Sequence, residues 1–197
     1  MGNKRSGQVR TTASSGGSRK TYIIVGAVVL AFVAGFIALV VIDSRQQAAS
    51  TPPGEVQTYD VGPANEHTQG DVEYDQTPPT GGEHNPVWQN SGFYEDPVRD
   101  ENAVHTLEHG AVWITYAPDL PQDQKDQIRE LVEGQTCMLA SPHEDLPTPV
   151  VASAWGKQLT LESADSPDLQ RFVRAYRQGP QTQEPGASCT GGTADTV

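Results

Sequence analysis

The chain of 197 residues is organised around Asp100-Glu-Asn-Ala-Val-His-Thr-Leu-Glu-His-Gly110 and the apolar run Ala111-Val-Trp-Ile-Thr-Tyr116 that follows it. His105 and His109 are four residues apart, and on a helix this spacing places both on one face, about 6 Å apart. The alternative, one long strand from Val104 to Tyr116, would separate them by roughly 13 Å. An acidic start at Asp100 as the N-cap and a glycine stop favour the helix, over residues 101–109. We therefore predict a short helix, then a buried strand, and place the functional site here.

The residues before this helix predict an irregular cap. Residues 61–97 are rich in Gly and Pro, and their aromatic side chains would pack the loops onto a core. Within this cap, the loop Thr77-Pro-Pro-Thr-Gly-Gly-Glu-His-Asn-Pro86 presents a third histidine, His84. His67 lies in a polar stretch, and we expect only a structural role for it.

Helical and strand patterns alternate after the pivotal helix. Helices are predicted over residues 122–133 and from Ser166 onward, with Pro167 at the first helical position. Strands are predicted over 111–116, 136–140, 150–155 and 158–161. This order predicts an α+β fold, a small sheet with two packed helices, in which a thioredoxin-like layer is one arrangement. No C-x-x-C motif is present, so a thioredoxin likeness would concern the fold only.

The N-terminal part predicts a membrane anchor. Residues 21–42 carry no charge, and at about 1.5 Å per residue they can cross a hydrocarbon core of about 30 Å. A cleaved secretory signal is the alternative, although this run exceeds the usual apolar length of about 7–15 residues. Residues 1–20 hold five of the 13 Lys and Arg and no acid, whereas residues 43–197 hold all 25 Asp and Glu. The positive-inside rule then predicts a single-pass cell-membrane protein with a cytoplasmic N-terminus.

The predicted organisation has five parts: a cytoplasmic basic arm (1–20), a transmembrane helix (21–42), a linker (43–60), an extracytoplasmic domain (61–190) and a tail (191–197). The acidic charge of the exported part excludes nucleic acid as a partner. Cys137 and Cys189 are the only cysteines, and in an oxidising space they are expected to form one disulfide. A bond that closes a loop of about 50 residues contributes about 4 kcal/mol in the chain-entropy model.

The primary functional prediction is a structural or partner-binding module of the cell envelope, in which the histidines hydrogen-bond loop carbonyls. The alternative is a metal-binding module. Imidazoles with a thioether suit copper, and three imidazoles with a carboxylate or water suit zinc. Glu83 or Glu108 would accept a hydrogen bond from the other ring nitrogen of His109. The candidate ligands are His84, His105, His109 and Met138, with His143 as the alternative to Met138.

An enzyme is the less favoured class. The letters His105-Thr-Leu-Glu-His109 match H-x-x-E-H, a zinc signature of one class of metallopeptidases. That class needs a larger fold than the exported part can supply, and no G-x-S-x-G nucleophile motif occurs.

Four stretches together match a known family: Thr77 to His84, His105 to Gly110, Pro149-Val-Val-Ala-Ser-Ala-Trp-Gly156, and Glu184-Pro-Gly-Ala-Ser-Cys189. By these the chain resembles the domain-of-unknown-function 3105 family of actinobacterial single-pass membrane proteins. Where that family commonly has Thr-Ser-Gly-Pro-His, this chain has Thr80-Gly-Gly-Glu-His84, which keeps the histidine. The resemblance implies an anchored extracytoplasmic domain and no particular activity.

Overall fold

The computed structural model describes residues 18–50, 53 and 55–197. The chain divides between Ala48 and Ala49 into two units. Helix α1, Ser18–Ser50, contains the apolar segment Thr21–Val41, whose mean hydropathy is 3.0 and whose side chains are all exposed. This is the length and composition of a membrane anchor or of a signal sequence. Of the predicted basic arm, only the start of α1 lies within the described residues.

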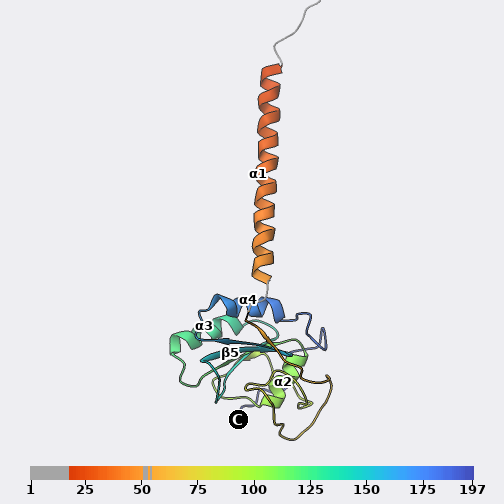
Figure 1. The fold of residues 1–197 in the computed structure, drawn as a ribbon, viewed down its shortest axis with the longest axis vertical. Helices are drawn as coiled ribbons and strands as arrows, with labels where there is room; N and C mark the ends of the chain where they lie inside the picture. The colour runs from red at the N-terminus through yellow and green to blue at the C-terminus, as the bar shows by residue number, and fades with distance from the viewer. Residues whose placement is uncertain (1–17, 51–52, 54) are drawn as a thin grey trace, which may run out of the picture. The chain divides into compact units, whose positions relative to one another are not determined.

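The second unit is built on a six-stranded sheet in the order β1-β6-β5-β3-β4-β2 (Figure 1). Its strands are β1 Gln57–Thr58, β2 Gly92–Phe93, β3 Val112–Tyr116, β4 Met138–Pro142, β5 Val150–Ala154 and β6 Lys157–Leu161. Central strand β3 pairs in parallel with β4 and antiparallel with β5. Helix α3, Gln122–Val132, makes the crossover that a parallel pair requires. The predicted α+β fold, with a small sheet and packed helices, is confirmed.

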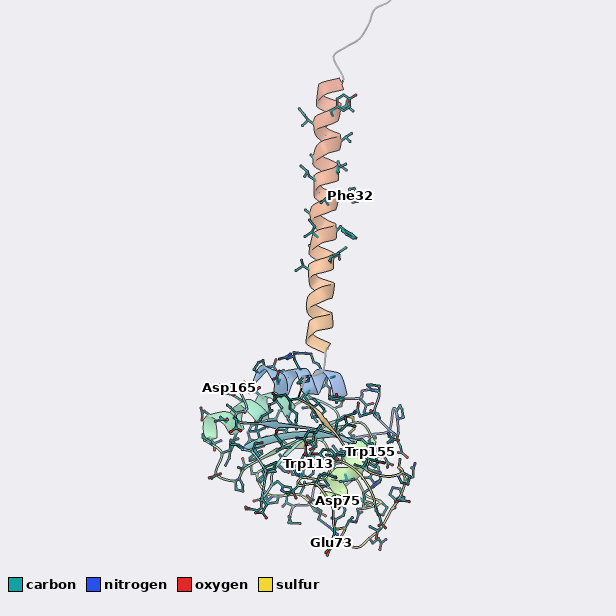
Figure 2. The ribbon with its side chains drawn as sticks, in the orientation of Figure 1. Phe32, Glu73, Asp75, Trp113, Trp155 and Asp165 are labelled. Carbon is teal, nitrogen blue, oxygen red and sulfur yellow. A yellow bond between two sulfur atoms is a disulfide. The ribbon has the colours of Figure 1, made fainter. Side chains whose placement is uncertain are left out.

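Side chains of β3 alternate between two cores, because successive residues of a strand point to opposite faces. Val112 and Ile114 join the larger core with α3 and α4, Pro167–Tyr176. Trp113 joins the second core with α2, Asp100–Glu108, and with Trp155 (Figure 2). Helices α3 and α4 thus cover one face of the sheet, and α2 with the cap covers the other.

Local chemistry explains where the predicted boundaries hold and where they shift. Ser166 caps α4 by accepting a hydrogen bond from the Asp168 backbone amide, and Pro167 opens the helix as predicted. In α2 the N-cap is Arg99 without a side-chain bond, so the prediction of Asp100 as the cap is wrong by one residue. Strand β4 begins at 138 rather than 136, because Cys137 has a left-handed backbone with φ of 54°.

The cap is ordered, irregular and joined to the C-terminal end of the unit. Besides β2, isolated bridges join His67 to His84 and Gln89 to Thr193. The last of these brings in residues 191–197, the predicted tail, and the Val197 amide also donates to the Pro97 carbonyl. The predicted linker, residues 43–60, contains the end of α1 and strand β1.

Candidate metal centre

Helix α2 carries the site because it is buried between the sheet and the cap. Residues 101–108 are all buried, polar ones included. Val104 and Leu107 pack in the core against Trp113. His105 and Glu108 therefore lie inside the protein, away from bulk water, and need partners from the cap.

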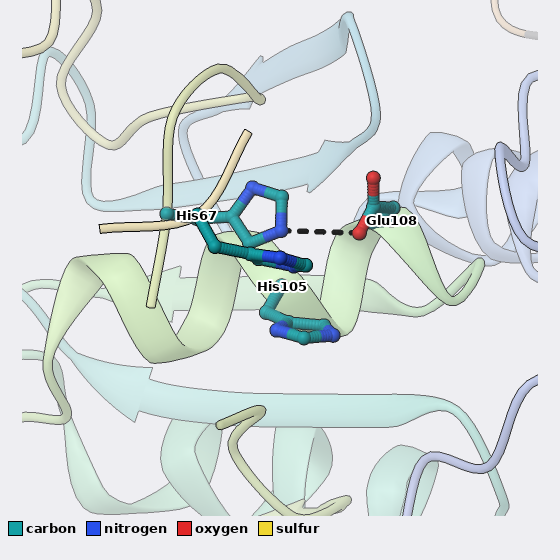
Figure 3. Close-up of side chains that lie close together, drawn as sticks. His67, His105 and Glu108 are labelled. Carbon is teal, nitrogen blue, oxygen red and sulfur yellow. Dashed lines mark hydrogen bonds and ion pairs between the residues drawn. The ribbon is translucent and has the colours of Figure 1, made fainter. Parts of the chain in front are cut away.

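Four side chains converge here, and we name them the His/Glu cluster: His67, His84, His105 and Glu108. One donor atom from each lies within 4.8 Å of all the others. Figure 3 shows His105 and Glu108 on α2 with the His67 ring beside them. Bonds of 2.0–2.1 Å to a tetrahedral zinc ion place ligand atoms about 3.3 Å apart. Small side-chain shifts, of about 1.5 Å for the most distant pair, would close the cluster around one ion.

Backbone carbonyls fix the orientation of three imidazole rings. The Nδ1 atoms of His84, His105 and His109 lie 2.7, 2.6 and 2.7 Å from the carbonyl oxygens of Gly82, Asn85 and Ser188, in that order. A carbonyl oxygen only accepts, so each Nδ1 carries the proton, and in a neutral ring each Nε2 then holds a lone pair. A fixed Nδ1–H and a free Nε2 are the state in which a histidine binds a metal ion.

The Nε2 atoms of His84 and His105 each face another atom that carries a lone pair, so a cation would stabilise both contacts. His84 Nε2 lies 3.0 Å from Glu108 Oε2, the hydrogen bond drawn in Figure 3. His105 Nε2 lies 2.9 Å from His109 Nε2. With neutral rings, each of these pairs sets two lone pairs against each other. Each pair is relieved by one added proton or by a metal ion.

The electrostatics of α2 favour a neutral His105 imidazole beside an ionised Glu108 carboxylate. Burial lowers the pKa of His105 to about 4, and the neighbouring histidines lower it further, against the Asn85 carbonyl that raises it. Burial raises the pKa of Glu108, but the contact with His84 and the hydrogen bond from the Asn65 amide together outweigh it, and the net pKa is lowered. Glu108 Oε1 accepts from the Asn65 amide at 2.6 Å, which leaves Oε2 turned to the cluster.

His109 lies at the edge of the cluster rather than within the group of four. Its Nε2 is 3.4 Å from Glu184 Oε2, and its ring centroid is 5.0 Å from that of Trp88. The predicted acceptors Glu83 and Glu108 do not serve its Nδ1, because the Ser188 carbonyl does.

Two other predicted ligands lie elsewhere. Met138 pairs in register with Val112, so it points with Val112 into the α3/α4 core on the opposite face of the sheet. The prediction of Met138 as a thioether ligand is therefore wrong, because its side chain lies on the other side of the sheet from the histidines. His143 follows β4 and pairs with Asp100 at the start of α2, 3.3 Å away. Burial lowers the pKa of His143, but the bond to Asp100 with its charge, the Glu144 carbonyl and the charge of Asp145 together outweigh burial, and the net pKa is raised.

Glu108 was predicted as a hydrogen-bond acceptor rather than as a ligand, and the member of the cluster that was given no role in the site is His67. Its ring stacks on His105 with centroids 5.1 Å apart and meets His84 edge-on at 4.8 Å. A bridge places it there, in which the Thr68 amide donates to the His84 carbonyl. Sixteen residues of irregular cap separate His67 from His84, so no periodic signal could have joined them.

The C-terminal segment closes the end of α2. Cys137 and Cys189 form the predicted disulfide, with Cα atoms 5.1 Å apart, packed beside Ala111. Ser188, next to Cys189, supplies the carbonyl that holds His109. The disulfide at Cys189 and the carbonyl that orients the His109 ring, from Ser188, therefore come from adjacent residues.

Comparison with known proteins gives one match. Residues 66–191 match a family described as "Protein of unknown function (DUF3105)". This range contains the whole His/Glu cluster, His109 and both cysteines. No curated protein and no solved structure matches the chain.

Proposed function

Because the chain belongs to the DUF3105 family, whose description leaves the function unknown, we propose a function from its site: the second unit binds one divalent transition-metal ion through the His/Glu cluster. One observation carries the proposal. Imidazole lone pairs and a carboxylate oxygen converge in a buried place, and carbonyls hold two of the rings in the ligand tautomer. Such a set of donors is the kind that binds a transition-metal ion.

The donor set favours zinc or copper(II). Three imidazoles and a carboxylate suit Zn²⁺, and the same nitrogen donors bind Cu²⁺ more tightly in the Irving–Williams order. Copper(I), which favours soft thioether and thiolate ligands, loses support because Met138 lies in the other core. Zn²⁺ and Cu²⁺ are therefore the two ions to test.

We also propose that α1 is an uncleaved anchor in a cell membrane, with the metal site outside. The basic N-terminal arm and the acidic second unit support this single-pass topology. The disulfide supports an oxidising compartment. The resemblance to actinobacterial membrane proteins supports the same location.

The envelope scaffold remains the second candidate function, for a specific reason. The carbonyl bonds to His105 and His109 also tie separate loops to the end of α2, and the bond to His84 holds its own loop, as buried structural histidines do. In that case the positive charge would be a proton, and a partner protein would be the ligand.

Metal titration of the full chain in detergent micelles separates the two candidates. Calorimetry with Zn²⁺ or Cu²⁺ should give one ion per chain. The ring centroids of Trp88 and Trp155 lie 5.7 Å from that of His105 and 5.9 Å from that of His84, so Cu²⁺ should quench their fluorescence. His105→Asn keeps a side-chain N–H for the Asn85 carbonyl but removes Nε2, and it should weaken binding at least about 100-fold.

His143→Asn is the matched control, because His143 lies outside the cluster and should leave affinity unchanged. Absence of binding, or one-to-one binding that survives His105→Asn, overturns the metal function. The first of these results leaves the envelope scaffold.

A further inference from the structure

The His/Glu cluster is asymmetric in exposure. His84 and Glu108 are fully buried and His105 is 5% exposed, whereas His67 is exposed. A ligand shell with one exposed member has one side open to solvent. Structural zinc sites are closed, and sites that act on an outside molecule keep one position accessible.

The cluster is also asymmetric in how its side chains are held. Each buried member has a second atom fixed: His84 by the Gly82 carbonyl, His105 by the Asn85 carbonyl and Glu108 by the Asn65 amide. Among the described residues, no hydrogen bond to the His67 side chain is found, and its ring has only ring contacts.

The backbone around His67 is nevertheless fixed on both sides. Before it, the Asn65 amide donates to Glu108, and after it the Val72 amide donates to Glu101 at 2.9 Å. The bridge to residue 84 holds His67 between these points. Rotation about the His67 side-chain bonds therefore removes the imidazole from the cluster without breaking a backbone hydrogen bond. Exposed side chains change rotamer within picoseconds to nanoseconds.

From this asymmetry we propose that His67 is the exchangeable ligand through which the ion enters and leaves. This inference rests on the proposed metal function. When His67 turns out, three buried ligands keep the ion, and an incoming nitrogen, oxygen or sulfur donor takes the vacated position. The Zn²⁺ or Cu²⁺ ion then moves to the new donor without a change of oxidation state, and His67 returns. Such a site hands its ion over, whereas a closed site keeps it.

The test compares an exposed position with a buried one. Full-length protein in detergent micelles is loaded with Zn²⁺, and transfer to the chromogenic chelator 4-(2-pyridylazo)resorcinol is followed with time. His67→Ala should weaken affinity about tenfold and speed transfer by a similar factor. His84→Asn, which keeps the bond to the Gly82 carbonyl, should weaken affinity at least 100-fold.

Added imidazole gives the discriminating readout. Free imidazole reaches the exposed position, so it should restore the affinity of His67→Ala and leave His84→Asn unrescued. Equal losses in the two variants, or no rescue of His67→Ala, overturn the exchangeable ligand while the metal site stands. Wild-type protein that binds no Zn²⁺ overturns the proposed function itself. Circular dichroism of both variants is the control that checks whether they are folded.

Discussion

Glu108→Gln separates a metal site from a buried ion pair, because the two predict opposite changes in stability. In the structure, Glu108 Oε1 accepts from the Asn65 amide and Oε2 faces His84 Nε2 at 3.0 Å. Glutamine keeps the first bond through its oxygen. A metal-binding His84 is neutral at Nε2, and the glutamine amide N–H₂ would then face its lone pair and could donate to it. The substitution thus replaces a repulsive contact with a hydrogen bond and removes a buried charge.

The expected magnitude follows from that exchange. A buried hydrogen bond contributes about 1 kcal/mol net. The metal-free protein should therefore gain about 1 kcal/mol, which raises the melting temperature by about 2–4 °C for a unit of about 150 residues. Metal affinity should fall at least about 100-fold, since the anionic ligand is lost. If His84 were instead an imidazolium paired with Glu108, breaking the buried pair would cost about 3–5 kcal/mol.

The assay is thermal and urea unfolding of chelator-treated protein, with and without added Zn²⁺. Wild-type protein should gain stability with Zn²⁺, and Glu108→Gln should be more stable than wild type without the ion and insensitive to it. Glu101→Gln is the matched control on the same helix, because Glu101 bonds the Val72 amide and Arg99 and lies outside the cluster. A loss above about 2 kcal/mol for metal-free Glu108→Gln would refute the lone-pair argument.

Three further outcomes are expected. Gly110→Ala should cost about 2–4 kcal/mol in urea unfolding, because φ is 92° and the new Cβ would lie 2.6 Å from the Thr182 hydroxyl. Gly134→Ala, at φ of 73° with open space around it, should cost only about 1 kcal/mol. The pKa of His143 is raised in the folded protein, so its charged form should stabilise the fold below about pH 6.5, and this stability should be lost as the pH rises through the raised pKa. Asp100→Asn should remove this pH dependence of the free energy of unfolding. Met138→Leu should leave Zn²⁺ affinity unchanged in calorimetry, since Met138 lies in the α3/α4 core.

Local patterns were sufficient for helices α2, α3 and α4 and for strands β3 to β6, whereas the two-residue strands β1 and β2 were not predicted. The apolar periodicity of α3 and α4, and the buried run of β3, depend on residues close in sequence. The start of β4 was missed because a left-handed residue, Cys137, is a backbone property that composition does not encode. The pairing of residues 191–197 with the cap was missed for another reason, since contacts about 100 residues apart leave no periodic trace.

Residue spacing within one element predicted part of the site, whereas strand register and long-range contacts decided the rest. His105 and Glu108 follow from helical spacing, and His84 from a loop that must pack on that helix. Met138 was a wrong candidate because its face depends on the pairing register of β3 and β4, which sequence spacing does not fix. His67 needed the bridge to residue 84, which forms only in the folded cap.

The disulfide and the exposed His67 differ in how firmly they hold their segments, and this contrast supports exchange of the ion rather than storage. The Cys137–Cys189 bond spans 52 residues, and in the chain-entropy model it stabilises the fold by about 4 kcal/mol. It acts beside Ser188, so it secures the ring of His109 and the buried side of the site. No covalent bond secures the His67 segment, which hydrogen bonds alone hold. A site built only to keep an ion would need rigidity on every side. Here rigidity is concentrated on the buried ligands, and the exposed one is left free to turn.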